Sequence, residues 1–323
     1  AAVHAAVILP HAKFKIGPGT AHSTVGGALP RGTTGGNGAV KGVLPSLYAV
    51  AKISDRVRFG LGVAVPFGLA TKYPENWAGR YYAVKSQIQT INVNPALAFK
   101  VNDQWSFGIG MSIQHTKVEL SNMTRLAGGA NPVDSKLDFK GKHTGVGFNA
   151  GLMYEPWKGT RFGLSYRSNV RHSLKGDVKI SNPGNLPVAS NLFTNGKISA
   201  DMKTPDVANL SVSHDVNAKW TLLGDIMMTR WTVFRELKID RPDLGKSYPA
   251  DAQGWKNVFM YSIGLNYKPT EKWVFRLGAA YDQSPTKDKY RSPRLPDNDR
   301  VWLTTGVDYN WSERVTTKIG YAR

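Results

Sequence analysis

The sequence predicts an all-β protein, specifically a transmembrane antiparallel up-and-down β-barrel, and three observations lead to this fold class. Segments of about ten residues alternate bulky apolar side chains with small ones, as transmembrane β-strands do. Short polar turns alternate with long connections, which is the organisation of an outer-membrane barrel. No stretch approaches the roughly 18 consecutive apolar residues of a membrane-spanning helix.

The alternation is clearest in residues 100–120, "KVNDQWSFGIGMSIQHTKVEL". After a polar turn, one face carries bulky side chains and the other is nearly bare. We interpret the bulky face as the one that meets lipid and the small face as the lining of an interior. A closed barrel also satisfies every backbone hydrogen bond, which hydrocarbon demands. The bulky face comprises Trp105, Phe107, Ile109, Met111 and Ile113; the small face comprises Ser106, Gly108, Gly110, Ser112 and Gln114.

The segment "WVFRLGAAY", residues 273–281, places an arginine on the face opposite its aromatic residues. An arginine that faced lipid at mid-depth would cost about 2–4 kcal/mol. We therefore expect Arg276 to face the lumen.

The element order follows from the turns. Short turns begin near residues 52, 100, 154, 214, 267 and 309, and the connections between them are rich in Gly, Pro, Asn, Asp and Ser. The predicted long loops are 17–41, 71–80, 121–140, 176–199, 239–254 and 284–299. The predicted strands are 2–16, 42–53, 57–70, 80–101, 105–120, 141–155, 160–175, 200–216, 220–238, 255–268, 272–283, 300–310 and 314–323.

These strands number thirteen, whereas bacterial single-chain barrels have an even number. The chain also starts within the pattern. We therefore expect residues 1–323 to form a single barrel domain, truncated at both ends, with a fourteenth strand and a segment before the first strand outside this sequence.

Composition restricts the function classes. The chain has no cysteine, which excludes disulfides and cysteine-based zinc sites. The net charge of +19 invites a nucleic-acid reading, but the basic residues are scattered and no nucleic-acid-binding motif accompanies them. We expect no nucleic-acid partner, and place the basic residues in loops and the lumen, where they meet outer-membrane lipid, including lipopolysaccharide, or an anionic ligand.

Long stretches of the chain resemble a known family. Residues 66–83, "PFGLATKYPENWAGRYYA", are followed by "INVNPALAFKVNDQWSFGIG", and residues 294–322 read "RLPDNDRVWLTTGVDYNWSERVTTKIGYA". These segments resemble the FadL/toluene-X family of outer-membrane transporters for long-chain fatty acids and other hydrophobic compounds. The resemblance extends over essentially the whole chain through hairpin order and loop placement.

The resemblance implies a monomeric fourteen-stranded barrel in the outer membrane of a Gram-negative bacterium. It also implies passive transport without a cofactor: capture between the third and fourth long loops, a lumenal site, and lateral exit at a kink in the third strand. The family's N-terminal hatch is missing from this sequence. Its Asn-Pro-Ala signature occurs only at Asn94-Pro95-Ala96, inside a predicted strand.

The third predicted strand contains Pro66-Phe67-Gly68. Proline removes a ladder donor and glycine weakens pairing, so the two together can open a local defect. We predict the lateral-gate kink here. The alternative is an ordinary bulge near the barrel rim.

Two groups of candidate ligand-binding residues follow. In the predicted capture loops, Met123, Leu126, Leu192 and Phe193 form a groove, or else pack beneath their own loops. In the lumen, a carboxylate ligand would pair with a basic residue beside an apolar wall. The candidates are Arg276, Arg161 and Arg167; alternatively, each balances a lumenal carboxylate such as Asp225 or meets water.

Three other functions stay open. The same route serves monoaromatic hydrocarbons if the inner pocket is purely apolar. A lipid hydrolase needs an assembled serine, histidine and orienting partner, but the 7 histidines are scattered and no G-x-S-x-G occurs. His115 and His143 lie near each other on adjacent predicted strands, too few ligands for a metal site. The last alternative is a structural barrel that transports nothing. We expect a transporter, not an enzyme.

Overall fold

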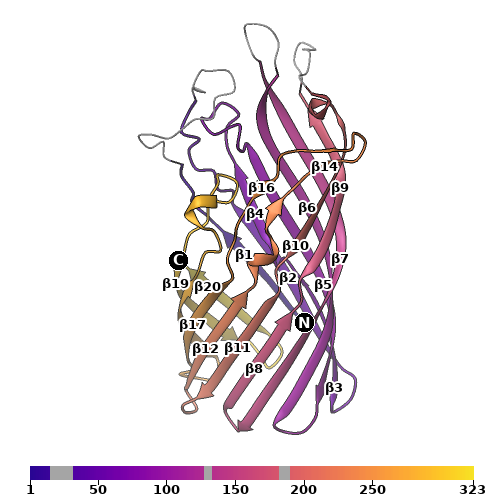
Figure 1. Cartoon of the computed structure of the whole chain (residues 1–323). Helices are drawn as coiled ribbons and strands as arrows, with labels where there is room; N and C mark the ends of the chain where they lie inside the picture. Colours follow the sequence, from indigo (N-terminus) through magenta and orange to yellow (C-terminus); the bar gives the residue numbers. More distant parts are fainter. Residues whose placement is uncertain (15–31, 127–132, 182–189) are drawn as a thin grey trace.

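The computed structural model describes residues 1–14, 32–126, 133–181 and 190–323. One antiparallel sheet curls into a barrel (Figure 1). Its strands are β1 (Ala2–Ile8), β2 (Gly42–Lys52), β3 (Val57–Ala64), β4 (Gly68–Lys72), β5 (Lys85–Lys100), β6 (Trp105–Leu126), β7 (Val133–Trp157), β8 (Thr160–Arg167), β9 (Val170–Ile180), β10 (Gly196–Thr204), β11 (Val207–Asp215), β12 (Trp220–Thr229), β17 (Val258–Tyr267), β18 (Trp273–Asp282), β19 (Arg300–Asn310) and β20 (Thr316–Ala322).

The remaining elements are short. The 3-10 turns are η1 (Asn191–Phe193), η2 (Trp231–Val233) and η3 (Asp288–Tyr290); between β12 and β17 lie β13 (Glu236–Leu237), β14 (Asp240–Arg241), β15 (Lys246–Ser247) and β16 (Asp251–Ala252). No helix in the described residues is long and apolar enough to cross a membrane.

The wall of the barrel contains thirteen strands in the described residues, which agrees with the sequence prediction. The sheet has 18 strands, but β14 and β15 belong to a loop. Three pairs, β3 with β4, β8 with β9 and β10 with β11, run in line and act as single wall strands, because β5 pairs with both members of the first pair and β7 with both members of the second. The described strands β1 and β20 are the two edges of the sheet and form no ladder with each other.

The two faces of the wall differ as predicted. On β6, Ile109 is 54% exposed and Met111 is 44% exposed, whereas Ser112 and Gln114 are each 1% exposed. So many exposed apolar side chains would be unfavourable in water. They are stabilised if this surface faces lipid.

Aromatic pairs mark the end of the barrel that carries the short turns. Cross-strand neighbours stack there: Trp105 with Tyr154 at a centroid distance of 4.1 Å, and Trp220 with Tyr267 at 4.3 Å. Such rings belong at a membrane–water interface. They define one boundary of the apolar band.

Two predicted loops are wrong. Residues 121–140 and 176–199 were expected to be connections, yet β6 continues to Leu126, β7 begins at Val133, β9 continues to Ile180 and β10 begins at Gly196. These strands extend beyond their neighbours in Figure 1. Their outer face carries charged residues because it meets water beyond the apolar band, which made the segments look like loops. The centres of both predicted loops, and most of 17–41, lie outside the described residues.

The predicted strand 220–238 is also too long. β12 ends at Thr229, and the chain then turns into η2. The reason is packing: Trp231 and Phe234 both contact the ring of Trp255, so these apolar residues meet each other and not the lipid.

Candidate functional site

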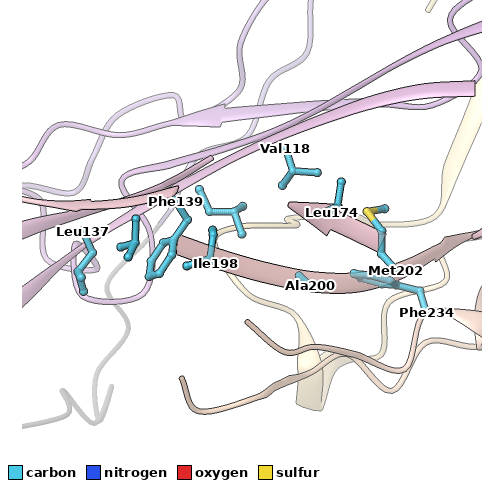
Figure 2. Packing of buried hydrophobic residues seen from close by; sticks show 10 residues of the cluster. Val118, Leu137, Phe139, Leu174, Ile198, Ala200, Met202 and Phe234 are labelled. Carbon is cyan, nitrogen blue, oxygen red and sulfur yellow. The ribbon is translucent and has the colours of Figure 1, made fainter. Parts of the chain in front are cut away.

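The parts of β6, β7, β9 and β10 that extend beyond the lipid-facing apolar band form what we call the extended wall. Its inner face carries an apolar cluster. All of its members except Phe234 come from alternate positions of the four adjacent strands β6, β7, β9 and β10, so they point the same way. Phe139 of β7 lies opposite Leu120 of β6 and Val178 of β9, which fixes the strands' order across the cluster. The buried members are Val118, Leu120, Leu137, Phe139, Leu174, Val178, Ile198, Ala200, Met202 and Phe234 (Figure 2).

The segment between β12 and β17 covers this cluster. Phe234 is buried within it, and Leu237, Ile239, Tyr248 and Trp255 pack against it. Tyr248 meets Phe139 edge-on, with ring centroids 4.9 Å apart. The apolar wall is therefore closed by a chain segment that is itself apolar on its inner side.

Arg241 fastens the covering segment. Its side chain is 1% exposed and donates to the carbonyl of Thr194 at 2.8 Å and to the Asp243 carboxylate at 2.8 Å. Asp243 raises the pKa of the Arg241 guanidinium, and Arg241 in turn holds the pKa of Asp243 below its usual range. The segment thereby binds the chain next to η1.

The wall strand made of β3 and β4 is interrupted at Val65–Phe67. β3 pairs with β5 as far as Ala64, opposite Asn92, and β4 resumes with Gly68 opposite Gln89. Three residues of this strand therefore face two residues of β5, which is a bulge. Thr90 spans the bulge: its hydroxyl accepts from the Phe67 N–H at 2.9 Å and donates to the Phe67 carbonyl at 2.6 Å.

On its other side the same strand loses its partner. The ladder between β2 and β3 ends at Leu47 opposite Val63 and is followed only by an isolated bridge between Ala39 and Thr71. Residues 42–46 of β2 consequently have no ladder partner on that side in the described structure, although they pair with β1. Phe67 meets the ring of Trp231 edge-on at 5.9 Å, so the interrupted strand contacts the start of the covering segment.

Arg294 is a cation at the edge of the apolar cluster, and sequence reasoning missed it. It donates to the Ser86 hydroxyl at 3.2 Å and to the Asn122 side-chain oxygen at 3.3 Å. Ser86 lies opposite Leu120, a member of the cluster. Removal from water lowers the pKa of the Arg294 guanidinium to about 10, although the charge of the Asp251 carboxylate acts in the opposite direction. No carboxylate of the described residues lies within ion-pair distance of Arg294. An acyl chain with an anionic end matches this combination.

The basic residues predicted for the lumen have different surroundings. Arg276 lines an interior cavity of about 750 Å³ whose wall is rich in small residues, among them Gly163, Ser211 and Gly224. It is neutralised by the buried Asp308, at 3.1 Å, and donates to Asn266. Arg161 also lines the cavity and pairs with Glu155 at 3.3 Å.

The other two residues predicted to lie in the lumen, Arg167 and Asp225, do not pair with each other in the structure. Arg167 ends β8 and is exposed. Asp225 accepts a hydrogen bond from Asn209 at 2.7 Å, so it does not balance an arginine directly. Of the three predicted arginines, Arg276 and Arg161 therefore line the same cavity, and Arg167 is not part of its lining.

The four predicted capture residues do not form one groove. Met123 and Leu126 lie on β6, not in a loop, and are 9% and 1% exposed. Leu192 and Phe193 form part of η1, and Phe193 packs against the apolar cluster. Of the four residues, only Phe193 packs against the cluster.

The predicted histidine pair lies on opposite faces of the wall. His115 faces outward and bonds to Thr144 at 2.9 Å, whereas His143 lies opposite Thr116 and meets the ring of His172 at 5.7 Å. No group of three or more metal-ligating side chains occurs among the residues that the structure describes.

The wall has an outward apolar band, an interior cavity and an apolar cluster beside a desolvated cation. These features define a β-barrel that carries hydrophobic molecules across the outer membrane. The sequence profile described as "Outer membrane protein transport protein (OMPP1/FadL/TodX)" matches residues 1–323. The chain belongs to this family, whose relatives are outer-membrane proteins of Gram-negative bacteria.

Two curated relatives agree. The chain is 31% identical over 306 residues to the long-chain fatty acid transport protein of Escherichia coli O6:H1, covering 86% of this chain and 68% of that protein. It is 26% identical over 323 residues to outer membrane protein P1 of Haemophilus influenzae, covering 91% and 69%. The first relative is named as a transport protein and the second as an outer-membrane protein.

Solved structures support the fold. A FadL homologue from Pseudomonas aeruginosa superposes with a TM-score of 0.82 at 26% identity, over 99% of this chain and 79% of that one. The toluene transporter TbuX of Ralstonia pickettii superposes with a TM-score of 0.68 at 19% identity, over 90% and 77%, which shows likeness of fold alone.

Proposed function

We propose that this transporter carries long-chain fatty acids, and that Arg294 receives the carboxylate while the apolar cluster holds the acyl chain. The observation that carries the proposal is the desolvated Arg294 guanidinium, which forms no ion pair with the residues that the structure describes and hydrogen-bonds to Ser86, opposite Leu120 of the apolar cluster. The nearby Asp251 carboxylate offsets only part of the cost of burying this cation. A fatty acid carboxylate supplies that charge, and neither toluene nor an ester does.

The route begins at the extended wall. Ligand enters beside η1, where Phe193 reaches the cluster, and displaces part of the covering segment from Phe139 and its neighbours. It leaves sideways where the β2–β3 ladder is interrupted, close to the Phe67–Trp231 contact. No energy source is needed, because each step is a diffusive exchange between apolar environments.

The test compares ligands and variants of the purified chain in detergent. Arg294→Gln should weaken binding of a long-chain fatty acid by on the order of tenfold or more, since a charge-assisted hydrogen bond contributes about 1.5–3 kcal/mol. Binding of the corresponding methyl ester and of toluene should change little. Lys287→Gln is the matched control: it removes one exposed positive charge from the same loop and keeps the backbone bond to Tyr290.

Equal loss of acid and ester binding in Arg294→Gln would refute the carboxylate role. Tighter binding of toluene than of any fatty acid by the unaltered chain would instead identify monoaromatic hydrocarbons as the cargo. Measurable hydrolysis of a lipid ester by the pure protein would oppose transport as its sole activity.

A further inference from the structure

We propose that the outward face of the extended wall is a docking site for the phosphates of lipopolysaccharide, centred on Lys117, Lys142 and Lys175. These residues form one row across three strands: Lys142 of β7 lies directly opposite Lys117 of β6 and directly opposite Lys175 of β9. All three side chains are exposed on the outer surface.

The row places three positive charges side by side, and among the described residues only one of them has an acidic partner, which it shares with another lysine. Like charges directly opposite each other on neighbouring strands destabilise a sheet. Lys117 forms an ion pair with Glu119 at 2.9 Å, but Glu119 is shared with Lys85. Lys142 and Lys175 form no ion pair with any carboxylate in the described part of the chain.

Further basic side chains surround the row. Those exposed on the same face of β7, β9 and β10 are Lys140, Arg171, Lys179, Lys197 and Lys203. Asp177 pairs with Lys197 at 2.7 Å and Asp201 with Arg171 at 3.1 Å. The acidic residues thus neutralise the margin of the patch and leave its centre positive, which complements a multiply phosphorylated partner.

The height of the row fits a lipid headgroup. The last apolar lipid-facing pair on these strands is Ile113 with Val146, and Val146 is 61% exposed. Lys117 and Lys142 follow four residues farther along, about 13 Å at the usual rise per residue. With a strand tilt of about 40°, that is roughly 10 Å above the apolar band. Lysine stems reach back toward the interface, so the ammonium groups stand at headgroup level.

The occupant follows from the side of the membrane. The short-turn end of an outer-membrane barrel faces the periplasm, so the extended wall lies on the outer side. Lipopolysaccharide is the phosphate-rich lipid of that leaflet, and its acyl chains would lie on Val146, Phe148 and neighbouring exposed apolar residues. A zwitterionic phospholipid brings its own ammonium group to the row and is disfavoured there.

The experiment uses the full chain in detergent and native mass spectrometry with bisphosphorylated lipid A, dephosphorylated lipid A and phosphatidylethanolamine as separate probes. The double variant K142Q/K175Q should retain bisphosphorylated lipid A on the order of 30-fold less well, the effect expected from two basic residues near an anionic surface. K219Q/K272Q, which removes two lysines of the short turns, should bind as the unaltered chain does.

Three results would overturn the proposal: equal retention by K142Q/K175Q, equal retention of dephosphorylated lipid A, or displacement of lipid A by inorganic phosphate at comparable molar concentration, which would indicate a free-phosphate site. Because fatty acid binding is measured on the inner face, its presence or loss in the same variant is a separate readout and does not decide this proposal.

Discussion

At the scale of single residues, Trp77 shows how the segment between β4 and β5 is stabilised. It is fully buried, stacks on Tyr73 at 4.2 Å and donates from its indole nitrogen to the Ala83 carbonyl at 2.7 Å. Gly38 packs so closely that a Cβ there would lie 2.2 Å from the Tyr73 ring. Trp77 also meets the ring of Phe14 edge-on at 5.3 Å, so it links the segment of residues 73–83 to the N-terminal part of the chain.

Trp77→Ala should destabilise the segment between β4 and β5 by about 3–5 kcal/mol, because it removes a fully buried aromatic side chain. Limited proteolysis should then cut between Tyr73 and Ala83 in the folded barrel. Trp157→Ala, which removes a tryptophan that is 62% exposed at a short turn, serves as the control. Identical cleavage of the two variants would contradict the role assigned to Trp77.

The Arg241–Asp243 pair predicts a pH dependence. The native pKa of Asp243 is lowered by Arg241, so the pair's contribution is fully present above the ordinary aspartate pKa of about 3.9 and is lost as the pH falls through the lower native value. The protection of the amides of residues 239–248, measured as exchange relative to the intrinsic rate at each pH, should therefore fall on acidification below about pH 4.

Asp243→Asn is the control for this measurement. Its amides in residues 239–248 should be less protected than those of the unaltered chain at neutral pH, and their protection relative to the intrinsic rate should not change in the acid range, because the variant keeps the shape of Asp243 and lacks the titrating carboxyl. A parallel acid response in both proteins would place the titrating group elsewhere.

At the scale of elements, the interruption at Val65–Phe67 has two causes. One is the proline, and the other is a mismatch between the number of residues in this strand and the number in β5 that they face. Against β5 this strand has one residue too many, whereas between Leu47–Val63 and Ala39–Thr71 the two segments have equal lengths. The strand can be regular toward one neighbour only. A proline and a glycine suit this position, but the mismatch does not depend on them.

It follows that the double variant Pro66→Val/Gly68→Val should insert normally and keep fatty acid uptake within about twofold, because substitution leaves the extra residue in place. Linking Leu44→Cys to Pro66→Cys across the gap with a cleavable thiol reagent should block uptake, and cleavage should restore it. The chain has no native cysteine to interfere.

The outcome that opposes this account is loss of uptake in a correctly folded Pro66→Val/Gly68→Val variant. That result would assign the gap to the two residues themselves. Unimpaired uptake in the cross-linked protein would remove lateral exit at this strand.

At the scale of the whole molecule, the two faces of the wall meet different solvents. Leu210 is 52% exposed in the middle of β11, and its neighbour Ser211 lines the interior cavity opposite Asp225. Leu210→Arg should destabilise the inserted barrel by about 2–4 kcal/mol, because it places a charge in hydrocarbon. Ser211→Arg should cost much less, and urea unfolding in lipid vesicles measures both. Equal losses would refute the assignment of faces.

Alternation along the chain was enough to establish the barrel, the lipid-facing residues from Trp105 to Ile113, and the inward direction of Arg276. These properties depend only on the period of a strand and on the cost of a polar group in lipid. The family could also be inferred from the sequence, because the long segments that begin at Pro66 and Arg294 resemble it.

Only the tertiary structure decided where the strands leave the membrane, since charged outer faces such as that of Lys142 look like loops in a sequence. It also separated the predicted capture residues and brought Arg294 to Ser86 and Asn122, which lie 208 and 172 residues away along the chain. Local patterns report how each strand meets its surroundings. A chamber assembled from distant segments depends on register and on which charges lose water together, and no local period encodes either of these.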